Sequence, residues 1–166
     1  FANLPIANTP DYVSTFDDYT GVALDSTNDW TVVKDSGASA AIAADVESGA
    51  LLLSSTATTD NDGASVQGNE IFKVATGSSG RDIWFETKCK VSDADQMDFC
   101  IGMTVNFATN PENMLAAADR IVFESDDGAA TLQVITEKDG TETATSLSST
   151  YDLADDTFVT LSFKVS

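Results

Sequence analysis

Apolar and polar residues alternate along the middle of the chain, as they do in strands that bury one face. The alternation is longest over residues 97–107, where every second residue is apolar: Met97, Phe99, Ile101, Met103, Val105 and Phe107. Residues 82–91 repeat it, with Ile83, Phe85, Cys89 and Val91 on one face and Trp84, Glu86, Lys88 and Lys90 on the other. Both segments are therefore predicted to be half-buried strands.

Shorter runs of the same kind follow one another from residue 16 onward. We expect strands at residues 29–34, 50–54, 65–74, 120–125, 130–137 and 157–165. Asp-Gly pairs at 127–128 and 139–140 lie between or beside such runs and are typical of hairpin turns, because both residue types tolerate positive φ. This succession of short strands and turns predicts an all-β antiparallel jelly-roll β-sandwich over residues 16–166.

Two segments depart from the strand pattern. Residues 1–15 contain Pro5 and Pro10, which interrupt a helix, so they are expected to form an extended, apolar N-terminal arm. Residues 111–119 are the one helix candidate, with Asn110 as N-cap and Pro111 at the first helical position. The predicted helix is short and lies between two strands.

The last strand candidate, residues 158–165, is followed by no returning strand in the sequence. A closed sandwich needs one, because an unpaired edge exposes backbone donors and acceptors. We expect either that the natural chain continues into closing strands or that a partner covers this edge.

The composition argues against several function classes. The 166 residues carry 27 acidic and 8 basic side chains, a formal charge of −19, which disfavours nucleic acid and anionic membranes as partners. Histidine is absent, which removes Ser-His-Asp and Cys-His catalysis and every His-ligated metal site. The carboxylate density is read first as a solubility feature, with cation binding or a basic partner as the alternatives.

The two cysteines are predicted to be free thiols. Cys89 shares the apolar face of its strand, whereas Cys100 lies on the polar face of the next one. Directly opposed residues of a regular strand pair must share a face, so a disulfide across the hairpin is not expected.

Paired carboxylates are the one catalytic arrangement that this composition leaves open. Asp82 and Glu86 lie four residues apart on one outward face, the closest approach to the acid pair of a glycosidase. Trp84 lies between them and lysines follow, which breaks the pattern of acids. We therefore expect no enzymatic activity.

Two turns carry clustered oxygen ligands of the kind that calcium prefers. Asp60 and Asp62 lie in the first turn, and Asp126 and Asp127 lie in the second. Neither turn completes an EF-hand loop, and Asp, Asn and Gly are also favoured in turns for backbone reasons. No cofactor is expected, and calcium is the only metal with candidate ligands.

The outward face of residues 82–91 offers a candidate binding surface. Trp84 is the first candidate for stacking on a sugar, with Trp30 and Tyr151 as further aromatic residues. On the same face, Lys88 and Lys90 either meet an acidic partner or serve as solubilising charges.

Several segments together carry a resemblance. Residues 49–53 (GALLL), 84–88 (WFETK) and 97–103 (MDFCIGM) resemble the concanavalin A-like, laminin G-like jelly roll. Residues 16–21 (FDDYTG) and 91–97 (VSDADQM) are similar to segments of small acidic structural proteins of tailed bacteriophages, particularly marine and cyanobacterial ones. That resemblance implies a non-enzymatic virion protein on the outer surface of the capsid.

Within that group we expect a head decoration (cement) protein that binds the major capsid protein and neighbouring copies of itself, with a trimer natural around a three-fold axis. The arm and the last strand supply the candidate partner contacts, which are Phe1, Leu4, Pro5, Ile6, Tyr12, Phe158, Leu161 and Phe163. The alternative is a glycan-binding, lectin-like module of a tail fibre or of a secreted, extracellular bacterial protein, acting through Trp84.

Overall fold

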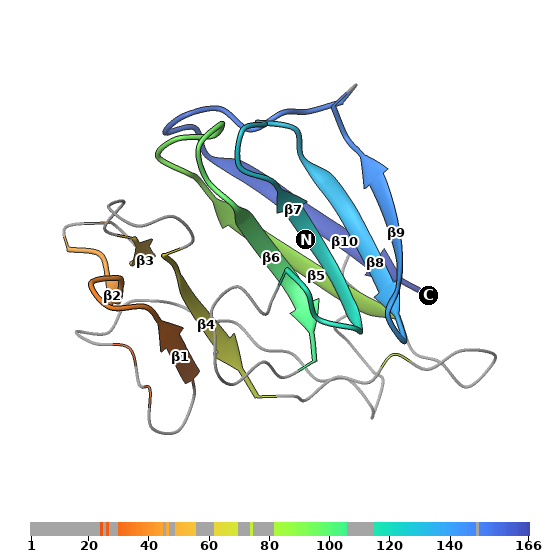
Figure 1. Cartoon of the computed structure of the whole chain (residues 1–166), viewed down its shortest axis with the longest axis horizontal. Helices are drawn as coiled ribbons and strands as arrows, with labels where there is room; N and C mark the ends of the chain where they lie inside the picture. Colours follow the sequence, from red (N-terminus) through yellow and green to blue (C-terminus); the bar gives the residue numbers. More distant parts are fainter. Residues whose placement is uncertain are drawn as a thin grey trace, which may run out of the picture.

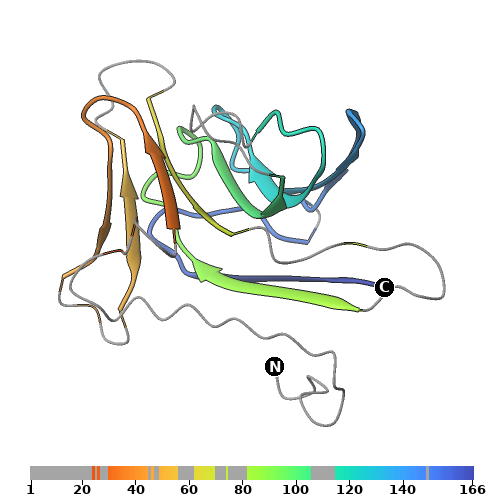
Figure 2. The same ribbon diagram turned by 90° about the horizontal axis from the view of Figure 1, so that it is seen from below.

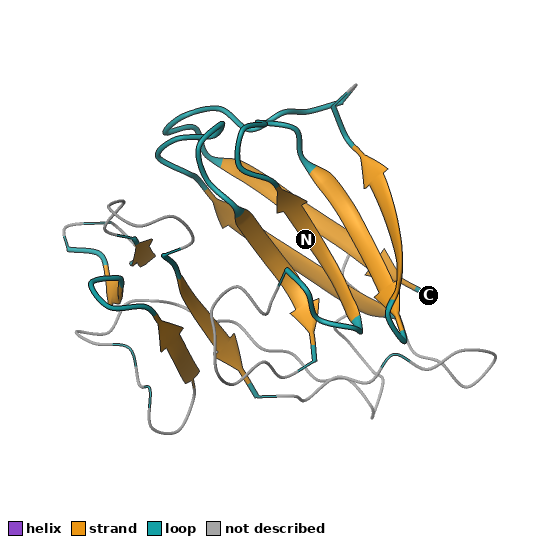
Figure 3. Ribbon diagram, in the orientation of Figure 1, coloured by secondary structure: helices purple, strands orange, loops and turns teal. Residues whose placement is uncertain are grey.

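A computed structural model of the chain describes residues 24, 26, 30–44, 46, 49–55, 62–69, 74, 82–105, 115–148 and 150–166. Within these residues every regular element is a strand and every strand pair is antiparallel (Figures 1 and 3). The strands are β1 (Trp30–Lys34), β2 (Ser39–Ile42), β3 (Leu51–Ser54), β4 (Ala64–Gly68), β5 (Ile83–Cys89), β6 (Phe99–Thr104), β7 (Arg120–Ser125), β8 (Gln133–Lys138), β9 (Thr141–Ser146) and β10 (Val159–Val165). The predicted all-β class and antiparallel pairing are confirmed.

The largest sheet has 4 strands, which lie side by side in sequence order, β6-β7-β8-β9. The turn between β8 and β9 consists of Asp139 and Gly140, with φ of 51° and 74°. Positive φ at both positions is the geometry of a type I′ hairpin, which matches the twist of the flanking strands. In this sheet the Asp-Gly pair marks a hairpin turn, as the sequence predicts.

The last strand, β10, pairs with β5 along its whole length, from Val165 opposite Ile83 to Val159 opposite Cys89. The last strand therefore has a partner on one edge, and that partner precedes β10 in the chain. That further strands or a partner protein cover its other edge stays a prediction. Among the described residues, β5 and β10 form a sheet of 2 strands, so each keeps one edge without a described neighbour.

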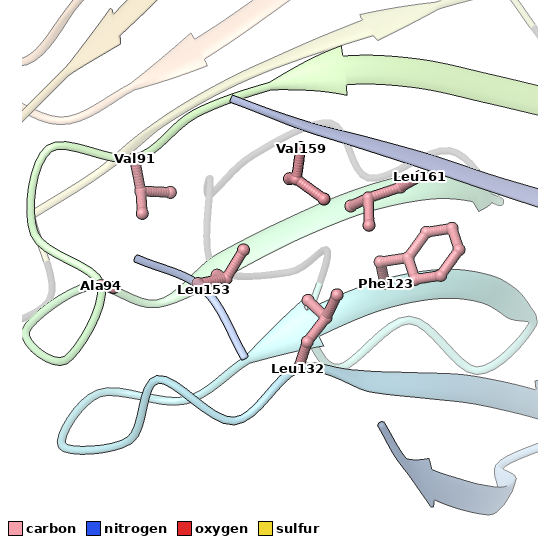
Figure 4. Packing of buried hydrophobic residues seen from close by; sticks show 7 residues of the cluster. All are labelled: Val91, Ala94, Phe123, Leu132, Leu153, Val159 and Leu161. Atoms are coloured by element: carbon pink, nitrogen blue, oxygen red, sulfur yellow. The ribbon is translucent and has the colours of Figure 1, made fainter. Parts of the chain in front are cut away.

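The main core lies between the β5–β10 sheet and the four-stranded sheet, which face each other in Figure 2. Its buried members, shown in Figure 4, are Val91, Ala94, Phe123, Leu132, Leu153, Val159 and Leu161. Phe85 of β5 stacks on Phe163 of β10 with ring centroids 4.9 Å apart, and both pack against this cluster. Phe99 and Ile101 of β6 close it from the other sheet.

Strands β1 to β4 lie to one side of this core (Figures 1 and 2). β1 pairs with β4 and β2 pairs with β3, forming two sheets of 2 strands each. The Gln67 side-chain amide of β4 donates a hydrogen bond to the carbonyl of Val105, just after β6, at 3.3 Å. The members of the main core all come from residues 85–163, so β1 to β4 contribute no residue to it.

The predicted helix over residues 111–119 is not observed in the part that the structure describes. Residues 115–119 form turns and a bend, and residues 111–114 lie outside the described residues. The end of the segment is held by the β8–β9 turn, because the Asp119 carboxylate accepts hydrogen bonds from the Asp139 amide and from Lys138, each at 3.0 Å.

The arm predicted over residues 1–15 lies outside the described residues. Where the chain is described, no helix has the length and apolar character to cross a membrane.

Candidate functional site

The strongest candidate site is the side of the β5–β10 sheet that faces away from the core. Strand alternation places every second residue there, and the pairing register sets Trp84 beside Lys164, Glu86 beside Ser162 and Lys88 beside Thr160. We call this surface the outer face of β5–β10, and its members are Trp84, Glu86, Lys88, Lys90, Phe158, Thr160, Ser162 and Lys164.

Two large aromatic side chains lie exposed at opposite ends of this face. Trp84 is 48% exposed and Phe158 is 55% exposed. Trp84 and Lys90, which lies against Phe158, are separated by about 20 Å of extended strand at ~3.3 Å per residue. Exposed aromatic side chains are enriched at binding surfaces, because they supply large contact area at low cost in side-chain entropy.

A cation accompanies each of these rings. The Lys164 ammonium lies 5.3 Å from the Trp84 ring centroid, and the Lys88 and Lys90 ammonium groups lie 5.1 and 5.7 Å from the Phe158 centroid. These distances fall within the range of cation–π attraction. The face therefore combines apolar contact area with positive charge in a chain whose formal charge is −19.

Two of the lysines are also neutralised at the ends of the face. Lys164 pairs with Asp82 at 2.7 Å, and Lys90 pairs with Asp156 at 2.8 Å. Asp82, one half of the carboxylate pair considered for catalysis, is therefore held by a lysine.

The centre of the face carries Glu86 and Lys88, the second of which also reaches the Phe158 ring. Both are exposed, and neither forms an ion pair with any residue that the structure describes. With Asp82 and Asp156 included, the three lysines are balanced by three carboxylates, so the charge of this region sums to zero.

A second cluster of charges lies on the face of the four-stranded sheet opposite the main core. Arg120 of β7 is 3% exposed and binds Glu124 at 2.7 Å, Glu137 at 2.9 Å and Glu142 at 2.6 Å. Burial acts to lower the pKa of Arg120, but the three carboxylates outweigh it and raise that pKa above its usual value. Each carboxylate is engaged by a guanidinium nitrogen, so the cluster links β7, β8 and β9 and offers no free acid or base.

The Arg120 cluster was missed from the sequence, although its signal was present. The Asp139–Gly140 turn fixes the hairpin register, which sets Glu137 directly opposite Glu142. Two like charges at opposed positions destabilise a strand pair unless a cation lies between them. Arg120, opposite Glu137 in the next pair of strands, is that cation.

The residues predicted to contact partners separate into three groups. Phe158 is exposed on the outer face of β5–β10, as a contact residue must be. Leu161 is 6% exposed and Phe163 stacks on Phe85, so both lie in the core because they alternate with the outward residues of β10. Phe1, Leu4, Pro5, Ile6 and Tyr12 lie outside the described residues.

The calcium candidates do not converge in the described part of the chain. Asp126 and Asp127 lie in the turn between β7 and β8, where the Asp127 amide donates to the Asp98 carboxylate at 2.7 Å. Asp62 lies just before β4, and Asp60 is outside the described residues. Within the described ranges no three Cys, Asp or Glu side chains are placed to hold a metal ion.

Both cysteines are free thiols. Cys89 packs against the main core, and Cys100 lies on the other face of its strand, paired with Glu124 in register, which confirms their predicted faces. Burial raises the pKa of Cys89 to about 11 and that of Cys100 to about 12, the Glu124 charge adding to the second shift. A raised pKa suppresses the thiolate, so neither residue has the character of an activated nucleophile.

No family model, no curated protein and no solved structure matches the chain.

Proposed function

We propose that the chain is a non-enzymatic structural protein of a phage virion, a head decoration protein on the outer surface of the capsid that binds capsid subunits and neighbouring copies of itself. Its proposed architecture is a concanavalin A-like jelly-roll β-sandwich. The two antiparallel sheets that face each other across one core support this architecture.

The observation that carries the proposal is the outer face of β5–β10. It presents two exposed aromatic rings, each beside a lysine, on a region without net charge. Such a face suits attachment to another macromolecule, because it offers apolar area and directional contacts without repelling an acidic surface.

The Arg120 cluster favours a scaffold role for that part of the four-stranded sheet over an acid–base site. An acid–base catalyst needs a carboxyl group that is free to exchange a proton with the substrate. Glu124, Glu137 and Glu142 are each bound by Arg120. The resemblance of the sequence to virion structural proteins points to the same class.

The test is quantitative mass spectrometry of purified phage particles that contain the chain. Copy numbers comparable to the major capsid protein are expected for a decoration protein. A handful of copies per particle would instead identify a tail or fibre component. Absence from particles would overturn the virion proposal.

A second candidate function is glycan binding, favoured by the exposure of Trp84 on the outer face of β5–β10. Lys164 lies over that ring, so it competes with a stacking sugar. If the face binds glycans, Trp84→Ala abolishes the signal on a glycan array and Lys164→Ala, which uncovers the ring, preserves or increases it. No signal with either the wild type or Lys164→Ala would remove this candidate.

A further inference from the structure

The two central charges of the outer face of β5–β10 are opposite in sign and lie two residues apart on one strand. Glu86 and Lys88 both point away from the core, since β5 alternates regularly between its two sides. Neither has an ion-pair partner among the described residues, although the lysines at the two ends of the face each have one. The centre of the face thus carries two charges that are not paired by any residue in the described part of the chain.

We propose that the outer face of β5–β10 binds the same face of a second copy of this chain across a two-fold axis. An isologous contact of this kind requires a self-complementary surface, in which position i meets j and j meets i. The axis lies midway between the β5–β10 sheets of the two copies, at the level of Thr87, and runs across the strands, perpendicular to β5. Rotation about it brings residue 86 of one copy opposite residue 88 of the other. Glu86 of each copy then lies opposite Lys88 of the other, and both central charges are paired.

The ends of the face are complementary under the same operation. The axis also exchanges residue 84 with residue 90, so Trp84 of one copy lies over the end that carries Lys90 and Phe158 in the other. Each exposed ring then meets a ring or a lysine stem, contacts that stabilise interfaces through buried area and cation–π attraction. Sheets packed face to face in this way lie about 10 Å apart, which side chains of this length fill.

Net charge restricts where two copies can meet. Each copy carries a formal charge of −19, so most of the surface of one repels the other. The charges of the outer face of β5–β10 and its flanking carboxylates sum to zero, which makes this region a place of low Coulombic cost. The face of a two-stranded sheet is small compared with the roughly 800 Å² per partner that a standard interface buries, so we expect association to be weak in dilute solution. It strengthens where copies are held side by side on a lattice.

The inference rests on that part of the proposed function in which copies of the chain touch one another. Its test uses the purified full chain without particles, so it can fail while the virion proposal stands, or hold while that proposal fails.

The experiment is sedimentation equilibrium of the full chain at increasing concentration in about 0.15 M salt, where surface charges are partly screened. Glu86→Lys and Lys88→Glu are each expected to weaken self-association at least about tenfold, because each sets two pairs of like charges against one another. Glu86→Lys is the sharper variant, since it lowers the net negative charge and would strengthen association if only overall repulsion mattered.

Mixing restores the complementarity. A Glu86→Lys chain has two central cations and a Lys88→Glu chain has two central anions, so an equal mixture is expected to form heterodimers at about wild-type strength. The double variant Glu86→Lys/Lys88→Glu is expected to associate with itself again. Lys138→Glu, at an exposed lysine of the other sheet, matches the charge change of Lys88→Glu and is expected to leave association unchanged.

Three results would overturn the proposal. The first is a wild-type chain that stays monomeric at millimolar concentration. The second is self-association that survives both single variants. The third is weakened association in the single variants that neither mixing nor the double variant restores, which would mean that Glu86 and Lys88 do not pair across a two-fold axis. Circular dichroism and urea unfolding of each variant establish that these exposed substitutions leave the fold intact.

Discussion

The Arg120 guanidinium and the Glu124 carboxylate lie 2.7 Å apart on β7, on the side of the four-stranded sheet away from the main core. The same guanidinium also binds Glu137 and Glu142, which face each other across the β8–β9 hairpin. One buried cation thereby neutralises like charges that the hairpin register forces together. The stability of three neighbouring strands depends on that cation.

Replacing Arg120 with Met is expected to lower the free energy of unfolding by about 3–5 kcal/mol, because it leaves carboxylates buried without a partner. Urea unfolding followed by circular dichroism measures the change. Lys138→Met is the control, since its ion pairs with Asp119 and Asp139 are exposed to solvent and contribute little to stability. Equal losses in the two variants would contradict a structural role for the Arg120 cluster.

Truncation of two adjacent residues of β5 is expected to lower stability to very different extents. Phe85→Ala removes a ring that packs on the core and stacks on Phe163, at a cost of about 3 kcal/mol in the free energy of unfolding. Trp84→Ala removes an exposed ring and is expected to cost less than about 1 kcal/mol. Chemical denaturation of both variants decides the matter, and a larger loss for Trp84→Ala would mean that the two faces of β5 are assigned the wrong way round.

Gly102 of β6 is expected to tolerate no side chain. A Cβ there would overlap the Ile121 carbonyl oxygen and lie 2.7 Å from the Val122 Cα, and the backbone φ is +156°. Gly102→Ala should therefore destabilise the chain by at least about 2 kcal/mol, through steric clash and backbone strain.

Gly140→Ala is the matched variant for this prediction, because Gly140 also has positive φ but has open space around its Cα. It should cost only the conformational term, about 1 kcal/mol. Thermal unfolding of both variants measures the difference, and equal losses of stability would contradict the predicted steric clash at Gly102.

The thiols are expected to react slowly in the folded chain. Relative to an ordinary pKa of 9.0, values of about 11 for Cys89 and about 12 for Cys100 reduce the thiolate population by about 100-fold and about 1,000-fold near pH 8. Iodoacetamide labelling, quantified by mass spectrometry in buffer and in urea, measures this. Labelling as fast in buffer as in urea would contradict the burial of these groups.

The same shifts fix the sign of a pH dependence. The folded chain favours the neutral thiols, so their stabilising contribution is complete below the unfolded-state pKa of 9.0 and is lost as pH rises towards about 11 to 12. Chains carrying Cys89→Ala or Cys100→Ala should show a smaller loss of stability over this alkaline range than the wild type. A steeper loss of stability with pH in either variant than in the wild type would contradict this prediction.

Hydrophobic alternation allowed prediction of the strands that bury one face. Residues 120–125 coincide with β7, and the outward direction of Trp84 follows from the period of two in β5. β9 was missed because Thr141–Ser146 (TETATS) is exposed along its whole length and offers no apolar period to detect. β2 was missed because its sequence, SAAI, has apolar residues at three consecutive positions and so shows no alternation, although the burial of its residues does alternate.

The partners of strands were harder to predict than the strands themselves. Nothing local in residues 158–165 indicates that their partner is β5, because pairing over such a sequence separation is decided by the shared core. Leu161 was therefore assigned to an external contact although it fills the interior. The Arg120 cluster escaped for a related reason, since its four members come from β7, β8 and β9.

The pairing of β10 with β5 also bears on how the protein is made. Val159 and Leu161 belong to the core, yet among the described strands β10 is the last to be synthesised. Until it emerges, the apolar side of β5 has no neighbour to complete the layer, and a ribosome that stalls before residue 159 leaves Phe85 without the ring on which it stacks. Contacts between strands that are distant in the sequence form slowly, because a long loop must close first. The nascent protein is therefore most exposed to aggregation just before its synthesis reaches this strand. Productive folding is therefore expected to follow release of this strand rather than to proceed gradually during elongation.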